Sequence, residues 1–489
     1  MFFESFRARV HQASSRRASA LVKHNQAERR TSSCDRSPGR PLADPKALKK
    51  HSLGVKGRVS RSAVRRLVTG AAAVVLVTTA CTTTDDAGPE GAAAPGPDIT
   101  VTPGPGAASV APNTPVRVEA AGGTITDVRV EQATADELAG ADGEAGGDTG
   151  AAVEEPAFTG TLSEDGTRWQ SDWNLAPGAA VSVYATAEDA GGEETEVVAE
   201  FHTEGVAKDA RLAVVSNFPQ TGDTVGVGMP VVVAFDRPVE NKVQVENSIE
   251  VTSEHEVEGA WNWVDDETAV FRPREYWKPH QKVSVDLRLT GVEAAEGVYG
   301  VDDDRIDFEI GRELISTMHV PDHELKVRVD GKAVRTIPVS NGKGQERFNT
   351  TTSGTHITME KYAALVMDSA TVGIPEGSPG HYRLDVDWAV RTSNSGEFTH
   401  AAPWNGNIGH ANTSNGCTNM SVEDARWFHD KALMGDVLET TGTGRELEWD
   451  NGWGFYQRSW KEWLEHSETG EPQVTDGSGT PGGVHGEGL

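Results

Sequence analysis

Cys417 lies in a loop of small polar residues, "HANTSNGCTNMS", which runs from His410 to Ser421. A buried structural cysteine has apolar neighbours, so this setting favours a reactive thiol. A thiol becomes a nucleophile when a base or a positive dipole stabilises its thiolate. His400, in the segment "GEFTHAAPW", is the first candidate for that base, and His410 is the second. These residue types predict acyl transfer through a cysteine.

The residues next to Cys417 also offer donors for an oxyanion, which forms when a carbonyl is attacked. Gly416 allows the backbone N–H groups of residues 416 and 417 to turn toward one point. A helix that begins near Val422 can direct its positive end toward the loop. A zinc site from His400, His410 and Cys417 is the alternative. Zinc sites usually show paired Cys or His residues at short spacing, and this segment has none.

Of the other two cysteines, Cys34 lies in a basic N-terminal region and Cys81 directly follows it. Residues 1–80 carry 17 of the 45 Lys/Arg and 4 of the 74 Asp/Glu, so their net charge is +13 and that of the remainder is −42. Arginines precede an apolar run, "LVTGAAAVVLVTTAC" (67–81), which is too short to span a bilayer and typical of a secretory signal. We therefore expect Cys34 to be removed on export.

Cys81 follows Thr78, Thr79 and Ala80, and this stretch resembles the lipobox of bacterial lipoproteins, in which the cysteine is lipidated and begins the mature chain. Thr78 departs from the Leu that the lipobox prefers. Ordinary cleavage that leaves a plain thiol is the alternative. Lipidation would anchor the protein through lipid to the outer face of the cytoplasmic membrane, in the cell envelope. Cys417 would then have no disulfide partner, as expected for a reactive thiol.

The pattern of the chain predicts a mainly β fold, because short alternating segments separated by turns dominate it. Two sets of strands repeat at a spacing of roughly 100–115 residues, which suits two immunoglobulin-like β-sandwiches without an inter-sheet disulfide. We expect an N-terminal extension and signal peptide (1–80), a lipidated cysteine and linker (81–98), two sandwiches (99–204 and 205–312), a β-rich catalytic domain (313–441), a Trp-rich subdomain (442–466) and a disordered tail (467–489).

One helix is predicted directly after the cysteine loop. Ser421 and Asp424 form a Ser-x-x-Asp capping box, the helix covers 422–434, and Gly435 follows its last turn. Further on, residues 449–466 hold four tryptophans, and aromatic side chains at this density usually fill a groove or cap a domain edge.

The tetrapeptide "SNGK" (340–343) matches the Ser-x-x-Lys motif of serine transpeptidases. That motif must open a helix, whereas this copy follows a predicted strand and contains the turn-forming pair Asn341–Gly342. The chain also lacks the Lys-Thr-Gly motif of those enzymes. We interpret the segment as a hairpin turn.

The segment "GEFTHAAPWNGNIGHANTSNGCTNM" resembles the active-site signature of the L,D-transpeptidases, with a His on a strand and a loop that ends in Ser-His-Gly-Cys-x-Asn or close to it. The likeness extends well over 205–466 and loosely over 99–204. It implies an enzyme that cleaves the terminal D-Ala of a tetrapeptide stem through a cysteine acyl-enzyme and forms 3→3 cross-links in peptidoglycan. Stem peptides, a donor and an acceptor amine, would be its partners, carbapenem β-lactams its inhibitors, and no cofactor would be required.

The alternative is a non-catalytic envelope lipoprotein whose immunoglobulin-like domains bind the cell wall. It explains the first two domains but not Cys417 together with His400. The acidity of the mature chain gives no indication of nucleic-acid binding.

The resemblance assigns roles position by position. Cys417 is the nucleophile, Gly416 belongs to the oxyanion site, and His400 is the base. Ala401 replaces the usual Ser, whose backbone carbonyl orients the imidazole. The positions implied to contact or line the substrate site are Tyr382, Ser395, Gly396, Asn419, Trp404 and Met367. The chain departs from the family pattern at two positions. Asn415 stands where the family has a His before Gly-Cys, and Val372 stands where the family often has an aromatic residue in the lid.

An acidic stretch, "GVEAAEGVYGVDDD" (291–304), offers oxygen ligands of the kind that Ca²⁺ prefers. Its spacing is not that of an EF-hand, so a solvated loop is the favoured interpretation. The resemblance adds that Glu293, Glu296 and Gly297 match a calcium site in the second domain of relatives, with Glu293 in place of an Asp. A structural calcium ion is therefore an expectation for these three residues.

Overall fold

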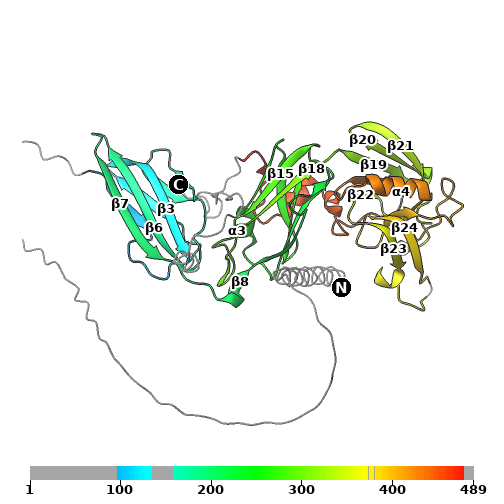
Figure 1. Cartoon of the computed structure of the whole chain (residues 1–489), viewed down its shortest axis with the longest axis horizontal. Coiled ribbons are helices and arrows are strands. Elements are labelled where there is room, and N and C mark those ends of the chain that lie inside the picture. Colours follow the sequence, from blue (N-terminus) through cyan, green and yellow to red (C-terminus); the bar gives the residue numbers. More distant parts are fainter. Residues whose placement is uncertain (1–95, 135–157, 373, 379, 478–489) are drawn as a thin grey trace, which may run out of the picture. The chain divides into compact units, whose positions relative to one another are not determined.

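A computed structural model describes residues 96–134, 158–372, 374–378 and 380–477 (Figure 1). The predicted signal peptide, Cys81 and almost all of the linker lie outside these residues, and the predictions about them stay predictions. Strands dominate the described part, as expected for a mainly β fold. No helix in this part is long and apolar enough to cross a membrane.

The first sandwich has a four-stranded and a three-stranded sheet around one core. Strand β6 alternates fully buried and half-buried residues, as a strand with one face on a core must. Val118, Val183 and Phe201 fill the space between the sheets. The first sheet has the order β1 (Asp98–Thr102), β2 (Arg117–Ala121), β5 (Arg168–Ser171), β4 (Gly160–Leu162), and the second β3 (Gly123–Thr134), β6 (Ala179–Asp189), β7 (Glu194–His202).

The second sandwich packs two larger sheets around an aromatic core that includes Trp261, Phe271 and Trp277. Helix α3 (Lys242–Asn247) and a small third sheet complete it. The sheets have the orders β10 (Thr224–Val225), β18 (Asp304–Ile310), β15 (Gln281–Leu287), β12 (Ile249–Ser253); β28 (Gln473–Val474), β13 (Glu258–Asp265), β14 (Thr268–Pro273), β11 (Val231–Phe235), β9 (Val214–Phe218); and β16 (Glu293–Ala295), β17 (Val298–Gly300), β8 (Arg211–Leu212).

The Trp-rich segment after the catalytic domain packs on this second sandwich. Its helix α5 (Trp460–Glu465) buries Trp463 completely, and the indole N–H of Trp463 donates to the Ala260 carbonyl at 3.0 Å. Trp453 and Phe455 join the same core. These aromatic residues were expected to fill a groove or cap a domain edge, and the structure places them in the core of the second sandwich.

The prediction of a disordered tail from residue 467 is wrong for residues 467–477. Strand β28 pairs antiparallel with β13, and the buried Thr475 exchanges backbone hydrogen bonds with Ser253 and Val257. The composition of the tail is polar, which favours disorder. An unpaired sheet edge, however, offers hydrogen bonds that do not depend on apolar side chains.

The catalytic domain has two sheets with helix α4 (Val422–Lys431) packed against the second (Figure 1). Phe428 and Ala425 of α4 share a core with Leu325 and Val327. The first sheet has the order β21 (Lys332–Pro338), β20 (Glu324–Val329), β19 (Leu314–His319), β27 (Val437–Thr441), β22 (Gly354–Ile357), and the second β23 (Lys361–Asp368), β24 (Arg383–Arg391), β25 (Phe398–Ala401), β26 (Thr418–Met420). The short 3₁₀ helices of the described part are η1 (Lys208–Ala210), η2 (Val320–Asp322), η3 (Arg347–Asn349), η4 (Ser369–Val372) and η5 (Gly454–Gln457).

Helix α4 begins where the capping box predicts and ends earlier than expected. The Ser421 hydroxyl accepts the Asp424 N–H, which confirms the N-cap. The helix stops at Lys431 instead of 434, because Ala432 is extended. The Leu433 N–H then donates to the buried carboxylate of Asp436 at 2.8 Å rather than to a helical carbonyl.

The prediction of a hairpin turn at Ser340–Lys343 is also wrong. The segment runs extended, and Ser340 and Asn419 exchange backbone hydrogen bonds of 3.0 and 2.9 Å. The Ser340 hydroxyl donates to the Ala411 carbonyl at 2.7 Å. Polar side chains thus bind this segment to the cysteine loop, whereas the Asn-Gly pair alone suggested a turn. Ser340 does not open a helix, which agrees with our rejection of a serine nucleophile.

Candidate active site

Two short parallel strands place the catalytic candidates on one face of a sheet. In the β25–β26 pair, His400 lies opposite Asn419, and Thr399 lies opposite Thr418. Side chains alternate along a strand, so Cys417, two residues before Asn419, shares its face and that of His400. The structure therefore brings Cys417 and His400 to the same sheet surface.

His400 is buried, with 3% of its surface exposed, and both ring nitrogens have partners. Nδ1 lies 2.8 Å from the Ala401 carbonyl oxygen, and Nε2 lies 3.0 Å from Nδ2 of Asn419. A carbonyl can only accept, so Nδ1 carries the hydrogen and Nε2 keeps its lone pair. Burial lowers the pKa of His400, while the bond to Ala401 raises it. The ring is thus held as a neutral base, and the backbone carbonyl of Ala401 orients it as predicted.

The Cys417 thiol is 8% exposed and donates to the Gly396 carbonyl at 3.6 Å. Burial raises the pKa of this thiol to about 12; the backbone N–H of Phe398 lowers it, and the charge of Glu397 raises it. Without a base the group therefore stays protonated at neutral pH. Since Nε2 of His400 contacts Asn419 here, it must exchange that partner before it can take the thiol proton.

Gly416 adopts a φ of 121°, a left-handed conformation that L side chains rarely adopt. Its N–H donates to the Ser414 hydroxyl at 3.1 Å, and that hydroxyl donates to the Cys417 carbonyl at 2.6 Å. The Gly416 carbonyl accepts from the Thr351 hydroxyl at 2.6 Å. These bonds fix the loop around the nucleophile. They also engage the Gly416 N–H, which would have to leave Ser414 to serve as an oxyanion donor.

The positions expected to meet the substrate surround this pair. Met367 and Tyr382 share an apolar cluster with Cys417. Burial, together with the neighbouring Cys417, raises the pKa of Tyr382 to about 12. Trp404 is 53% exposed and stacks on His400 with 6.3 Å between the ring centroids. Its exposed indole forms part of the surface beside the base.

Ser395 and Gly396 lie in the loop whose Gly396 carbonyl accepts the hydrogen bond from the Cys417 thiol. Asn451, from the Trp-rich subdomain, accepts the Ser395 N–H at 2.8 Å and donates to its hydroxyl at 3.0 Å. The second candidate base, His410, is exposed in a turn, and its backbone N–H donates to the Asn407 carbonyl at 2.9 Å. The structure therefore places the predicted residues around Cys417 and His400, and it leaves His410 at the surface.

Sequence reasoning missed several residues that shape the site. Asn405 donates to Oδ1 of Asn419 at 3.0 Å and so fixes which end of that amide faces His400. Asn405 lies inside the signature segment, where its polarity was visible. Asn451 and Arg445 lie in a different subdomain, and no local pattern connects them to the loop. From its neighbours in the sequence, Glu397 resembles an ordinary exposed strand residue, but the structure buries it.

The residues predicted to hold calcium lie in the described part of the chain, and the calcium site stays a prediction. The two carboxylate oxygens of Glu293 accept the Gly297 N–H at 3.1 Å and Nδ2 of Asn113 at 2.8 Å. Glu296 is exposed. No group of three His, Cys, Asp or Glu side chains among the described residues is arranged to hold a metal ion.

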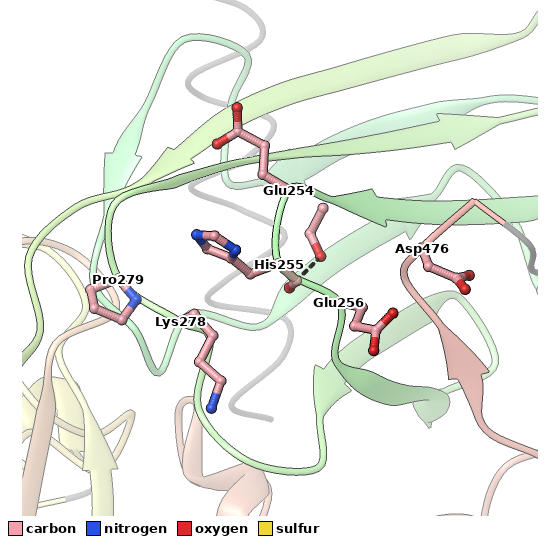
Figure 2. A pocket seen from close by; sticks show the side chains of 7 residues that line it. Glu254, His255, Glu256, Lys278, Pro279 and Asp476 are labelled. Carbon is pink, nitrogen blue, oxygen red and sulfur yellow. Dashed lines mark hydrogen bonds between the residues drawn. The ribbon is translucent and has the colours of Figure 1, made fainter.

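A pocket of about 750 Å³ lies on the second sandwich and contains none of the predicted catalytic residues (Figure 2). The returning tail supplies one of its lining residues, and charges of both signs line it. The pocket is formed by Ser253, Glu254, His255, Glu256, Lys278, Pro279 and Asp476.

Comparison with known proteins places two families on the chain. Residues 148–293 match a bacterial Ig domain, and residues 315–440 match the L,D-transpeptidase catalytic domain. The chain is 36% identical over 369 residues to L,D-transpeptidase 2 of Mycobacterium tuberculosis. The aligned region covers 75% of this chain and 84% of that protein. It is 30% identical to L,D-transpeptidase 5 of the same species over 381 residues, covering 76% and 77%.

A solved structure of the L,D-transpeptidase LdtMt1 in complex with imipenem is 37% identical. It covers 47% of this chain and 99% of its own, with a TM-score of 0.41.

Proposed function

This chain belongs to the L,D-transpeptidase family, whose members cross-link peptidoglycan, and on that premise we propose that Cys417 is its nucleophile and His400 its base. The observation that carries the proposal is the tautomer of His400. Its Nδ1–H is held by the Ala401 carbonyl, which leaves a lone pair on Nε2 on the sheet face that carries Cys417. A buried neutral imidazole in that place can accept the thiol proton.

In the first half-reaction, Nε2 of His400 takes the proton from Sγ of Cys417. The thiolate attacks the carbonyl carbon of the third residue of a tetrapeptide stem, and the carbonyl oxygen becomes an oxyanion. Backbone N–H groups at residues 416 and 417 stabilise that oxyanion once Gly416 releases Ser414. The oxyanion then collapses, the bond to the terminal D-Ala breaks, and His400 returns its proton to the leaving amine. A thioester on Cys417 remains.

In the second half-reaction, a side-chain amine of a neighbouring stem attacks the thioester. His400 accepts the proton of that amine, and the thiolate leaves and is reprotonated. The product is a 3→3 cross-link. The exposed Trp404 and the cluster of Met367 and Tyr382 supply apolar surface beside the nucleophile for the stem.

Carbapenems are proposed to acylate the same thiol, because the relative described with imipenem is 37% identical to this chain. The thiolate would open the strained lactam and remain as a thioester. The predicted lipid on Cys81 would hold the enzyme on the outer face of the cytoplasmic membrane, where stem peptides are found.

Peptide mapping after treatment with imipenem tests the proposal. The full chain should gain one adduct, and it should lie on the peptide that contains Cys417. The Cys417→Ser variant should gain none. An adduct on another residue, or none on the parent protein, would contradict the assignment of the nucleophile.

A further inference from the structure

A buried acid and a buried imidazole lie behind the nucleophile, and the proposed reaction uses neither. Glu397 is 6% exposed and His356 is 2% exposed. His356 Nε2 and Glu397 Oε2 are 3.7 Å apart, and the Thr352 hydroxyl lies 2.7 Å from each. Glu397 directly follows Gly396, whose carbonyl accepts the Cys417 thiol. The three side chains therefore form a row of contacts that ends at the residue after the one that accepts the Cys417 thiol.

If each of these contacts is a hydrogen bond, the three side chains hold one proton more than a carboxylate, a hydroxyl and a neutral imidazole supply. If Glu397 is ionised, it can only accept, so the single hydrogen of the Thr352 hydroxyl points to it. The hydroxyl must then accept from Nε2 of His356. Nδ1 of His356 faces the Gly354 carbonyl at 3.2 Å, which also only accepts, so both ring nitrogens carry hydrogen and the ring is cationic.

The second arrangement that satisfies every contact places the same proton on Glu397. The acid then donates to the Thr352 hydroxyl, the hydroxyl donates to Nε2 of His356, and Nδ1–H still donates to Gly354. The two arrangements differ only in the position of two hydrogens. The negative charge on Glu397 can therefore be removed without a proton from solvent.

That charge matters because Glu397 packs against the nucleophile loop. A Cβ placed on Gly416 would lie 3.9 Å from Cγ of Glu397. The ionised form of Glu397 raises the pKa of the Cys417 thiol. A thiolate on Cys417 and a carboxylate on Glu397 would be two buried like charges, which disfavour one another.

We propose that Glu397, Thr352 and His356 form a proton relay that neutralises Glu397 as Cys417 becomes a thiolate. The Nε2 proton of His356 passes to the Thr352 hydroxyl while the hydroxyl proton passes to Oε2 of Glu397. Protons and charge balance within the relay, and no bond to substrate changes. Glu397 is thus a positioning residue, and the role rests on the proposed function of Cys417.

Apart from His400, which takes the thiol proton, the relay is the part of these surroundings whose charge can change. Asn415, which stands where the family carries a His, cannot titrate near neutrality. The other charged groups hold fixed pairs. Arg445 contacts Glu397 at 3.4 Å and Glu448 at 3.9 Å, Arg347 pairs with Glu448, and Arg391 pairs with Glu360 at 3.0 Å and lies over the Phe398 ring.

The test is the pH dependence of Cys417 alkylation by iodoacetamide in the full chain, read by mass spectrometry of the Cys417 peptide. Glu397→Gln keeps an acceptor for Thr352 but removes the charge, so the midpoint should move to lower pH by about one unit. Thr352→Val keeps the volume but breaks the link, so Glu397 stays ionised and the midpoint should move to higher pH. Thr352→Ser restores the hydroxyl and should restore the parent profile.

Glu246→Gln is the matched control, because Glu246 is a buried carboxylate of the second sandwich that accepts from the Trp263 indole at 2.8 Å. Its alkylation profile should equal that of the parent.

Opposite shifts for Glu397→Gln and Thr352→Val support the relay. Shifts in the same direction, or slower labelling at every pH with an unchanged midpoint, would overturn it. Thermal unfolding shows whether each variant is folded. If Glu397→Gln does not fold, the contrast between Thr352→Val and Thr352→Ser decides alone. Imipenem treatment of the same samples separates the two proposals, because a parent protein without a Cys417 adduct contradicts the proposed function while the alkylation profiles still test the relay.

Discussion

His400 is held from both sides, and the two contacts have different consequences for its proton. The Ala401 carbonyl fixes the tautomer, while Asn419 occupies the lone pair that the reaction needs. The second contact must be broken when substrate arrives. The free energy needed to break the contact with Asn419 therefore adds to the activation barrier, whereas the contact with Ala401 is kept throughout the cycle.

Replacement of His400 should remove general-base catalysis. We expect His400→Ala to lower the rate of acylation by imipenem by on the order of 10²–10⁴. The control is His410→Ala, which should change the rate little because His410 is an exposed loop residue. Stopped-flow measurement of acylation compares the two, and the reverse ranking would exchange their roles.

Asn405 should control which end of the Asn419 amide faces the base. Asn405→Ala removes the hydrogen bond that fixes the orientation of the Asn419 amide, so the amide can also turn its oxygen toward His400 and select the wrong tautomer; acylation should fall by about fivefold. Asn405→Asp should lower it further. The new carboxylate accepts, so Asn419 turns its NH₂ toward it and its oxygen toward Nε2 of His400, which must then carry a hydrogen. Equal rates for the two variants would show that the amide does not turn.

Much of this residue-scale chemistry follows from the sequence, since Cys417 among polar neighbours and His400 on a strand are local patterns. Glu397 could not be recognised in this way. Its partners Thr352 and Arg445 are 45 and 48 residues away along the chain, and only the packing of separate elements buries it. The same reason explains why Asn451 was missed.

At the scale of elements, the site depends on segments that belong to different parts of the chain. The loop at Ser395 is fixed by Asn451 of the Trp-rich subdomain, and that subdomain is held by the core of the second sandwich. The strands and the capped helix were predictable because alternation and a capping box are local. The extended course of residues 340–343 and the pairing of β28 were not, because both depend on distant partners.

Removal of the central tryptophan of the Trp-rich subdomain should be costly. Trp463→Ala leaves a cavity in a fully buried position and an unpaired Ala260 carbonyl, so we expect a loss of about 3–5 kcal/mol in the free energy of unfolding. Trp460→Ala is the matched control. Trp460 is only half-buried, so it should cost less. Denaturant titration measures both, and equal losses would contradict the assigned role of Trp463.

At the scale of the whole molecule, the chain combines an expected anchor, two sandwiches and a catalytic domain. The mainly β architecture was predictable from alternation and spacing. The calcium site expected at Glu293 was suggested by the resemblance and stays a prediction; in the structure each carboxylate oxygen of Glu293 accepts one N–H donor. A motif match specifies residue types and leaves their partners open.

The anchor has a direct test. Cys81→Ala should release the protein from the membrane fraction, because the lipid would have no attachment site. The rate at which imipenem acylates Cys417 in the released protein should be unchanged. Cell fractionation followed by immunoblotting measures the release. A variant that remains in the membrane fraction would show that Cys81 does not carry the anchor.

The return of the chain to the second sandwich gives the catalytic domain two covalent connections to one body. The chain enters the domain after β18 and comes back through Trp463 and Thr475, both fully buried. The domain is therefore topologically an insertion. A single protease cut in either connection would leave it attached through the other, so limited proteolysis would nick this protein without shedding its catalytic part. An excised fragment that ends at residue 441 would leave behind the segment that holds Ser395.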